Sequence, residues 1–200
     1  MRVAVVGATG LIGSAVAAAR AAHEAVSEVV RGSRSAGVPV DIRDASSIAR
    51  FFTTVASAGP IDAVVCCAGR PRWGPMSDLA EADYLGSLHE KLLGQIMLTK
   101  LAIPYLRDGG VIVLTAGLLA RHAISGSTAA ATVNAALEGF VRAAALEMPR
   151  GCRVVVVSPG WVGEPGTDAR PRTPAADVAR AYIEAIRGDA NGSAISVGRM

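Results

Sequence analysis

The chain has 200 residues, and a chain of this length can bury roughly 70% of the surface that it exposes when unfolded. That is enough for a hydrophobic core in one domain without disulfides or a structural metal. Hydrophobic residues make up 51% and charged residues 18%, which excludes a disordered or a fibrous chain. Aromatic residues contribute only 4%, and the net charge of +3 contains no block of like charges, so nucleic acid is not an expected partner.

Cysteine usage and hydropathy indicate the cellular compartment. Cys66 and Cys67 are adjacent in one apolar run and Cys152 opens another, which is typical of buried thiols in a reducing compartment. The three histidines lie far from them without metal-ligand spacing, so no metal site is predicted. No apolar stretch reaches the ~18 residues of a membrane span. Glycines interrupt the apolar N-terminal stretch, so we interpret it as mature structure and expect a cytoplasmic protein without a membrane partner.

Short apolar runs alternate with amphipathic segments, which is typical of β-α units and a parallel sheet in an α/β fold. Asp44 and Ser127 are predicted helix N-caps. Gly59-Pro60 and Pro149-Arg150-Gly151 are predicted to end helices. Strands are predicted at residues 2–6, 27–31, 38–40, 61–66, 110–115, 153–158 and 194–197. Helices are predicted at residues 11–22, 44–58, 127–148 and 174–187, and within 78–107 with an interruption near Gly86.

The first candidate binding motif is the stretch Gly7-Ala8-Thr9-Gly10-Leu11-Ile12-Gly13, which directly follows the first predicted strand and opens the first helix. Glycines at this spacing permit a sharp turn, a close approach of the backbone to a pyrophosphate, and close helix–strand packing. The helix N-terminus then presents its N–H groups to the anion. A tight turn without a ligand is the alternative, but the strand–turn–helix context favours a dinucleotide loop.

About 20 residues further on, an NAD-preferring site is expected to show an acidic residue for the ribose 2′-hydroxyl. This sequence instead reads Arg31-Gly32-Ser33-Arg34. Arginine can pair with a 2′-phosphate and stack on adenine, so NADP(H) is the predicted cofactor. Either arginine alone could be a solvated loop cation, but that alternative explains less well why both occur together with no carboxylate nearby.

The order of these and later motifs resembles the short-chain dehydrogenase/reductase family over nearly the whole chain. The motifs are the glycine loop, Asp41-Ile42, Cys66-Cys67-Ala68-Gly69 and Ser158-Pro159-Gly160. The resemblance implies a Rossmann-type doubly wound domain with a largely parallel sheet of strand order 3-2-1-4-5-6-7. It also implies that Asp41 and Ile42 lie against the adenine, Ala68 and Gly69 against the adenosine ribose, and Pro159 and Gly160 beside the nicotinamide. Cys66-Cys67 replaces the family's usual Asn-Asn, and the glycine spacing resembles the extended or atypical branches.

The catalytic residues that the family uses are replaced here. The family pairs a Tyr with a Lys four residues later, the Lys lowering the phenol pKa and holding the ribose. In the matching stretch Ala130 takes the Tyr place and Asn134 the Lys place, and none of the three tyrosines is followed by Lys at that spacing. Ala116 stands where the orienting serine is usual, with Thr115 before it. Asn134 could still bond a ribose hydroxyl, but it supplies no positive charge.

Lys91 is a candidate replacement, because it stands where the family usually has an Asn before Leu-x-Gly. Our hypothesis is that Lys91 points into the cleft and supplies the missing charge, with Thr115 as its hydroxyl partner. A lysine on a helix surface is the alternative. Tyr84, seven residues earlier, could share the face of Lys91 if one helix ran through both.

The segment 161–173 is shorter than the family's usual substrate-covering insertion, which predicts a short lid and an open pocket with Trp161, Arg121 and His122 as candidate lining residues. Two functions remain open. One is an NADP-dependent oxidoreductase acting on a small carbonyl or alcohol, and the other is a pseudoenzyme that binds NADP(H) to sense it or to support a partner. The resemblance also implies a homodimer or homotetramer, formed through helices around residues 85–106 and 129–146.

Overall fold

The structure is a computed structural model that describes residues 1–21, 27–164 and 170–200. Within these residues, seven parallel strands form one sheet in the order β3-β2-β1-β4-β5-β6-β7. This confirms the predicted doubly wound α/β fold and its strand order. The strands are β1 (Arg2–Val6), β2 (Glu28–Ser33), β3 (Val38–Pro39), β4 (Ile61–Cys66), β5 (Leu106–Thr115), β6 (Arg153–Pro159) and β7 (Ala194–Val197).

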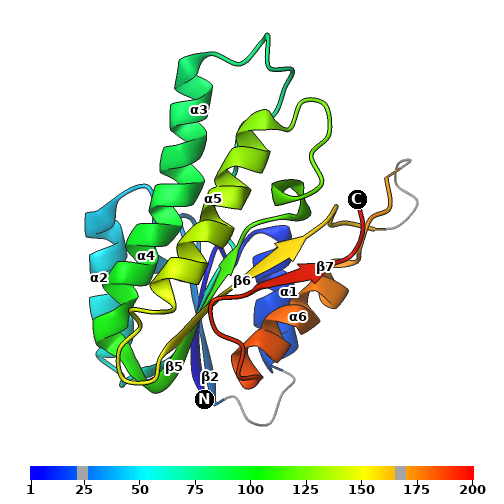
Figure 1. The fold of residues 1–200 in the computed structure, drawn as a ribbon. Helices are drawn as coiled ribbons and strands as arrows, with labels where there is room; N and C mark the ends of the chain where they lie inside the picture. Colours follow the sequence, from blue (N-terminus) through cyan, green and yellow to red (C-terminus); the bar gives the residue numbers. More distant parts are fainter. Residues whose placement is uncertain (22–26, 165–169) are drawn as a thin grey trace.

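Helices cover both faces of the sheet (Figure 1). One face carries α2 (Ala45–Ala56), α4 (Gly94–Ala102) and α5 (Thr128–Ala144), and the other carries α1 (Leu11–Ala21) and α6 (Ala175–Arg187). The helix α3 (Glu81–Ser87) projects beyond the end of the sheet and continues into α4 through the π-helical turn η1 (Leu88–Leu93). The short 3-10 turns are η2 (Ile103–Tyr105) and η3 (Leu118–Ala120).

The central strands are apolar in consecutive positions because both of their faces are buried. In β5, Val111 and Val113 join the core beneath α1 and α6, whereas Ile112 and Leu114 join the core beneath α2, α4 and α5. The same alternation sends the side chain of Thr115 and that of the next residue, Ala116, to opposite faces of the sheet. This placement decides which of the candidate residues can meet.

Several predicted boundaries are wrong. The helix predicted at residues 127–148 ends at Ala144, where Leu146 is 89% exposed and no longer faces the core. The long helical segment changes at η1 and runs unbroken through Gly86, because that glycine faces open space and costs the helix only intrinsic propensity. Strand β5 begins at Leu106 with a bulge opposite β4, four residues before the predicted start. The last residue of the helix predicted at 11–22 lies outside the described residues.

The two predicted N-caps differ in outcome. The Asp44 carboxylate accepts a hydrogen bond from the N–H of Ser46 and caps α2 as predicted. The Ser127 hydroxyl instead donates to the carbonyl of Ile124 and accepts from its N–H, so it closes the preceding turn and does not cap α5. Among the described residues, no helix is both long and apolar enough to cross a bilayer.

Candidate functional site

The turn between β1 and α1 requires glycine at two of its three glycine positions. Gly7 has φ +84°, and a Cβ atom there would lie 2.8 Å from the backbone nitrogen of Ala68. A Cβ at Gly13, in the first turn of α1, would run into the carbonyl oxygen of Gly7. At Gly10 the same atom would make an ordinary 3.4 Å contact. The close packing brings the N-terminus of α1 to the carboxyl ends of β1 and β4, where its N–H groups can receive an anion.

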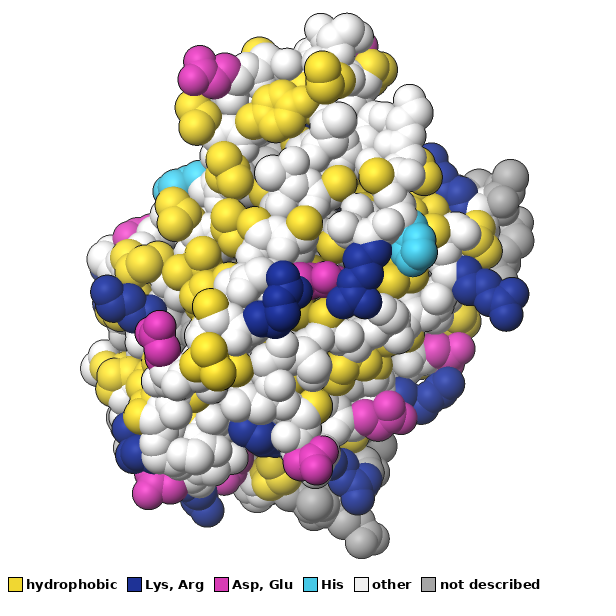
Figure 2. All heavy atoms as spheres, in the orientation of Figure 1, with side chains coloured by type: hydrophobic (Ala, Val, Ile, Leu, Met, Phe, Trp, Pro, Cys, Tyr) yellow, Lys and Arg dark blue, Asp and Glu magenta, His cyan; other side chains and the backbone are white. Residues whose placement is uncertain are grey.

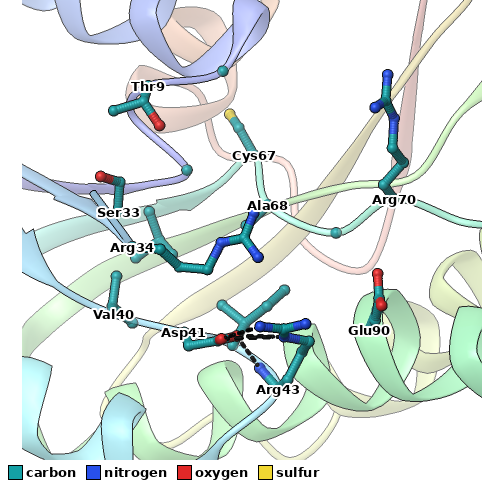
Figure 3. A pocket seen from close by; sticks show the side chains of 15 residues that line it. Thr9, Ser33, Arg34, Val40, Asp41, Arg43, Cys67, Ala68, Arg70 and Glu90 are labelled. Carbon is teal, nitrogen blue, oxygen red and sulfur yellow. Dashed lines mark hydrogen bonds and ion pairs between the residues drawn. The ribbon is translucent and has the colours of Figure 1, made fainter. Parts of the chain in front are cut away.

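A cavity of ≈ 230 Å³ opens beside this turn (Figure 3). It is lined by residues from the carboxyl ends of β1, β2 and β4 and from the loop after β3. The predicted cofactor residues that line it are Gly7, Thr9, Gly10, Ser33, Arg34, Asp41, Ile42, Ala68 and Gly69. The predicted residues outside this lining are Leu11, Ile12, Gly13, Arg31, Asn134, Pro159 and Gly160.

The two arginines predicted to receive a 2′-phosphate are separated in the structure. Strand β2 extends to Ser33, so Arg31 is a paired residue within the strand and lies outside the cavity lining. Arg34 follows the strand, and its guanidinium extends over the cavity (Figure 3). Of the two arginines, only Arg34 lines the cavity, and a role for Arg31 stays a prediction. The Ser33 hydroxyl is also held locally, since it donates to the carbonyl of Ala36 and accepts from its N–H.

Sequence reasoning missed Arg43, which lines the cavity next to Asp41. The Arg43 guanidinium donates to both carboxylate oxygens of Asp41, at 3.0 Å for Oδ1 and 2.6 Å for Oδ2. These bonds, strengthened by the charge of Arg34, lower the pKa of the Asp41 carboxyl to about 2 although partial burial opposes the shift. The signal was present in the sequence, because Arg43 follows the Asp41-Ile42 motif directly. Cys67, Arg70 and Glu90 are further lining residues that the sequence did not single out.

The hypothesis that Thr115 is the hydroxyl partner of Lys91 is wrong. The Thr115 hydroxyl donates to the carbonyl of Cys66 at 2.5 Å and lies 2.7 Å from the phenol of Tyr182 on α6. Lys91 lies on the other face of the sheet, where its Nζ donates to the carbonyl of Ala116 at 3.0 Å. The strand alternation at the end of β5 is the physical reason for the separation. Gln95 of α4 fixes this strand end by hydrogen bonds to both backbone groups of Thr115.

Lys91 is a buried residue, which contradicts the alternative of a surface lysine. It lies in the π-helical turn η1 and packs against Gly69. A Cβ atom built on Gly69 would come within 2.9 Å of the Lys91 Cα. Desolvation lowers the pKa of Lys91 to about 8, opposed only by the nearby Cys66. Tyr84, on the same run of helix, points elsewhere and shares a 2.9 Å hydrogen bond with the Thr128 hydroxyl. Single π turns in helices occur frequently at functional sites.

Asn134 of α5 carries a polar atom without a partner. Its Oδ1 is buried and has no hydrogen-bond partner among the residues that the structure describes. Its Nδ2 lies against the backbone of Gly117, where a Cβ would approach it to 2.9 Å. Ala130, one helical turn earlier, is buried as well. A buried carbonyl oxygen that lacks a donor is unfavourable in the free protein, and a ligand hydroxyl would satisfy it.

The loops that follow β4 and β6 are in contact through their tryptophans. Trp161, after β6, makes an edge contact with Trp73, after β4, at 5.5 Å between ring centroids, and Arg170 lies over the Trp161 ring. Of the candidate lid 161–173, residues 165–169 lie outside the described residues. The Arg121 guanidinium donates to the buried carboxylate of Glu138, which accepts a second bond from Ser158.

The remaining lining and cofactor residues predicted from the sequence near these loops are His122, Pro159 and Gly160. His122 is exposed. Pro159 ends β6, and a Cβ at Gly160 would meet the carbonyl of Arg199, so the C-terminal segment itself requires glycine there. The described residues contain no cluster of three or more His, Cys, Asp or Glu side chains placed to hold a metal ion.

The lowered pKa of Lys91 predicts a pH effect on stability. Because the folded pKa of about 8 lies below the ordinary lysine pKa of 10.5, the unfolded chain binds more protons between these values. The contribution of Lys91 to the free energy of unfolding is therefore expected to increase as pH rises from 8 to 10.5. Thiols with raised pKa, such as Cys66, act in the opposite direction in both proteins, and the loss of the Lys91 charge raises the Cys66 pKa further in a Lys91→Met variant. Urea unfolding of both proteins across this range measures the difference, and parallel pH profiles would contradict the prediction.

The glycine turn, the cavity at a strand-order reversal and the parallel sheet together define a doubly wound domain of the dinucleotide-binding class. Residues 7–198 match the family model described as enoyl-(acyl carrier protein) reductase. The chain belongs to the short-chain dehydrogenase/reductase family, in the group that this model represents.

Relatives and solved structures agree with this assignment. The chain is 31% identical over 140 residues to oxidoreductase UcpA of Salmonella typhimurium, covering 68% of this chain and 53% of UcpA, so it spans about half of that relative. Protein lin1944 of Listeria innocua superposes with a TM-score of 0.89 at 33% identity, covering 98% of this chain and 99% of lin1944. A small-chain dehydrogenase in complex with NADPH gives a TM-score of 0.85 at 27% identity, covering 98% and 96%.

Proposed function

We propose that the protein is an NADP(H)-dependent oxidoreductase of short-chain dehydrogenase type that acts on a small carbonyl or alcohol through a non-standard active site. The observation that carries the proposal is the turn at Gly7 and Gly13, which packs against the end of β4 and opens onto a cavity that Arg34 lines together with two other arginines. The NADPH complex of the structural relative and the oxidoreductase name of UcpA support it. We also propose that residues 1–200 form one domain.

The residues present fit a nicotinamide dinucleotide. When bound, such a cofactor supplies a hydride to a carbonyl carbon or removes one from an alcohol. The N-terminus of α1 would hold the pyrophosphate, Asp41 and Ile42 would border the adenine, and Arg34 would pair with the 2′-phosphate. Asn134 would accept a hydrogen bond from a ribose hydroxyl through its unpartnered oxygen. Trp73 and Trp161 would limit the space for substrate.

The alternative is a pseudoenzyme that binds NADP(H) without turnover. Ala130 and Asn134 favour it, because neither side chain can donate a proton as an acid or supply a positive charge. Loss of a positioned general acid typically slows proton transfer steps by about 10²–10⁴-fold. A family fold that keeps the dinucleotide cavity but lacks the acid would be expected to sense the nucleotide or to support a partner.

Calorimetric titration with NADPH and NADH, followed by incubation with a panel of carbonyl compounds, tests both functions. We expect NADPH to bind more tightly than NADH and the absorbance of reduced nicotinamide to fall with at least one carbonyl. Binding without turnover would favour the pseudoenzyme. Failure of both nucleotides to bind would contradict both functions.

We further propose that the protein forms a homodimer or homotetramer through α3, α4, α5 and the adjoining turns. Leu85, Leu93 and Leu146 are exposed on these segments, by 57%, 48% and 89%. Figure 2 shows hydrophobic side chains over the face that α3, α4 and α5 form. Exposed leucines on long neighbouring helices are typical of surfaces that associate.

A further inference from the structure

Lys91 and Asn134 reach the same peptide unit from two different helices. Lys91, on η1, donates from Nζ to the carbonyl oxygen of Ala116. Asn134, on α5, places its amide against Gly117, the next residue. A lysine ammonium has three N–H donors, and this carbonyl takes one of them. The end of β5 therefore brings together a donor with unused N–H groups and an acceptor, Asn134 Oδ1, that has no donor among the described residues.

The ammonium of Lys91 has no carboxylate partner in the described parts of the chain. The titratable neighbour that acts on its pKa is the Cys66 thiol of β4, which burial keeps neutral by raising its own pKa to about 12. Glu90, on the same turn, faces the cavity (Figure 3). On the neighbouring α5, Glu138 is bonded to Ser158 and Arg121. On α3, Tyr84 is bonded to Thr128. A buried cation without a counter-ion is costly, and a group perturbed by burial beside a cleft is a candidate for a functional site.

Lys91 is also next to the cavity. It lies directly behind Gly69, which lines the cavity, and no side chain larger than glycine fits between them. The residues at the places of the family serine and tyrosine are Ala116 and Ala130, which offer no competing hydroxyl. Lys91 is not itself a lining residue of the cavity; it packs against Gly69, which is one.

From this juxtaposition we propose that Lys91 and Asn134 replace the family's Tyr-Lys pair with a transposed pair, in which the Lys91 ammonium is the proton donor and Asn134 anchors the cofactor ribose. The proposal rests on the proposed function. In reduction, a bound NADPH would supply a hydride to the carbonyl carbon, which would leave the electron pair of the C=O π bond on oxygen. That oxygen takes a proton from Lys91, an N–H bond breaks as an O–H bond forms, and the neutral amine regains a proton from water. Oxidation of the alcohol reverses each transfer.

The charge state of Lys91 can be measured without a substrate. The chain has only two lysines, Lys91 and Lys100, so protein made with lysine carrying ¹³C at Cε gives two side-chain signals, assigned with a Lys100→Arg variant. Oxidised nicotinamide carries a positive charge that reduced nicotinamide lacks. We therefore expect the Lys91 pKa to be lower in the NADP⁺ complex than in the NADPH complex, while the exposed Lys100 stays unchanged. Equal Lys91 pKa values in the two complexes would overturn the proposal.

Substitution gives a second, independent readout. Lys91→Met keeps the length of the side chain and removes a buried charge, so we expect it to fold and to bind NADPH as the wild type does. Its carbonyl turnover is expected to fall by about 10²–10⁴-fold, and Lys91→Arg, whose guanidinium does not release a proton, should not restore it. Full turnover by Lys91→Met would overturn the proposal. Failure of the wild type to bind NADPH would instead contradict the proposed function, and so separates the two.

Discussion

Replacing Gly13 with alanine is expected to weaken NADPH binding by about 10- to 100-fold and to lower the free energy of unfolding by about 1–3 kcal/mol. The new methyl group would run into the Gly7 carbonyl oxygen, so the turn and the start of α1 must separate. That separation moves the helix N-terminus away from the place where it can receive a pyrophosphate. Calorimetry with NADPH and urea unfolding measure the two effects.

Two glycines provide controls for this variant. Gly86 lies inside α3 and faces open space, so Gly86→Ala is expected to stabilise the chain by about 0.5–1 kcal/mol and to leave NADPH binding unchanged. Gly10 is in the same turn as Gly13, but a Cβ there makes only an ordinary contact, so Gly10→Ala should cost less stability. Wild-type NADPH affinity in Gly13→Ala would show that the turn does not position the nucleotide.

The fold was predictable because its signals are local and agree with one another. Val-rich runs separated by amphipathic segments predict buried parallel strands, and the motif order supplied the strand order that the structure confirms. Boundaries were less predictable, since they depend on tertiary contacts. The π turn at η1 is an example, because no residue type marks the point where the hydrogen-bond pattern of the helix changes.

The candidate site was predictable at its glycines and less so at its charged residues. Arg31 lies within β2 because the strand continues to Ser33, two residues beyond its predicted end. Residue propensities do not determine the length of a strand that closely. The separation of Thr115 from Lys91 could have been inferred, because consecutive residues of a strand face opposite ways. The burial of Lys91 could not have been inferred from the sequence, since it follows from how closely η1 approaches Gly69.

Arg34 is expected to determine the preference for NADPH over NADH. A charge-assisted hydrogen bond to phosphate contributes about 1.5–3 kcal/mol, so Arg34→Ser should weaken NADPH binding by about 10- to 150-fold and leave NADH binding nearly unchanged. The fragments 2′,5′-ADP and 5′-AMP should show the same difference in calorimetry, because they differ only in the 2′-phosphate.

Arg31→Ser is the matched control, since it removes the same charge from the same strand end but from outside the cavity. An equal loss of NADPH affinity in both variants would mean that net charge, and not the position of Arg34, favours the phosphate.

Arg43 is expected to contribute less than Arg34, because Asp41 already occupies its guanidinium with two hydrogen bonds. Asp41→Asn weakens that competition, so it should increase the affinity for 2′,5′-ADP and not for 5′-AMP. An unchanged ratio between the two fragments would place the 2′-phosphate away from Arg43.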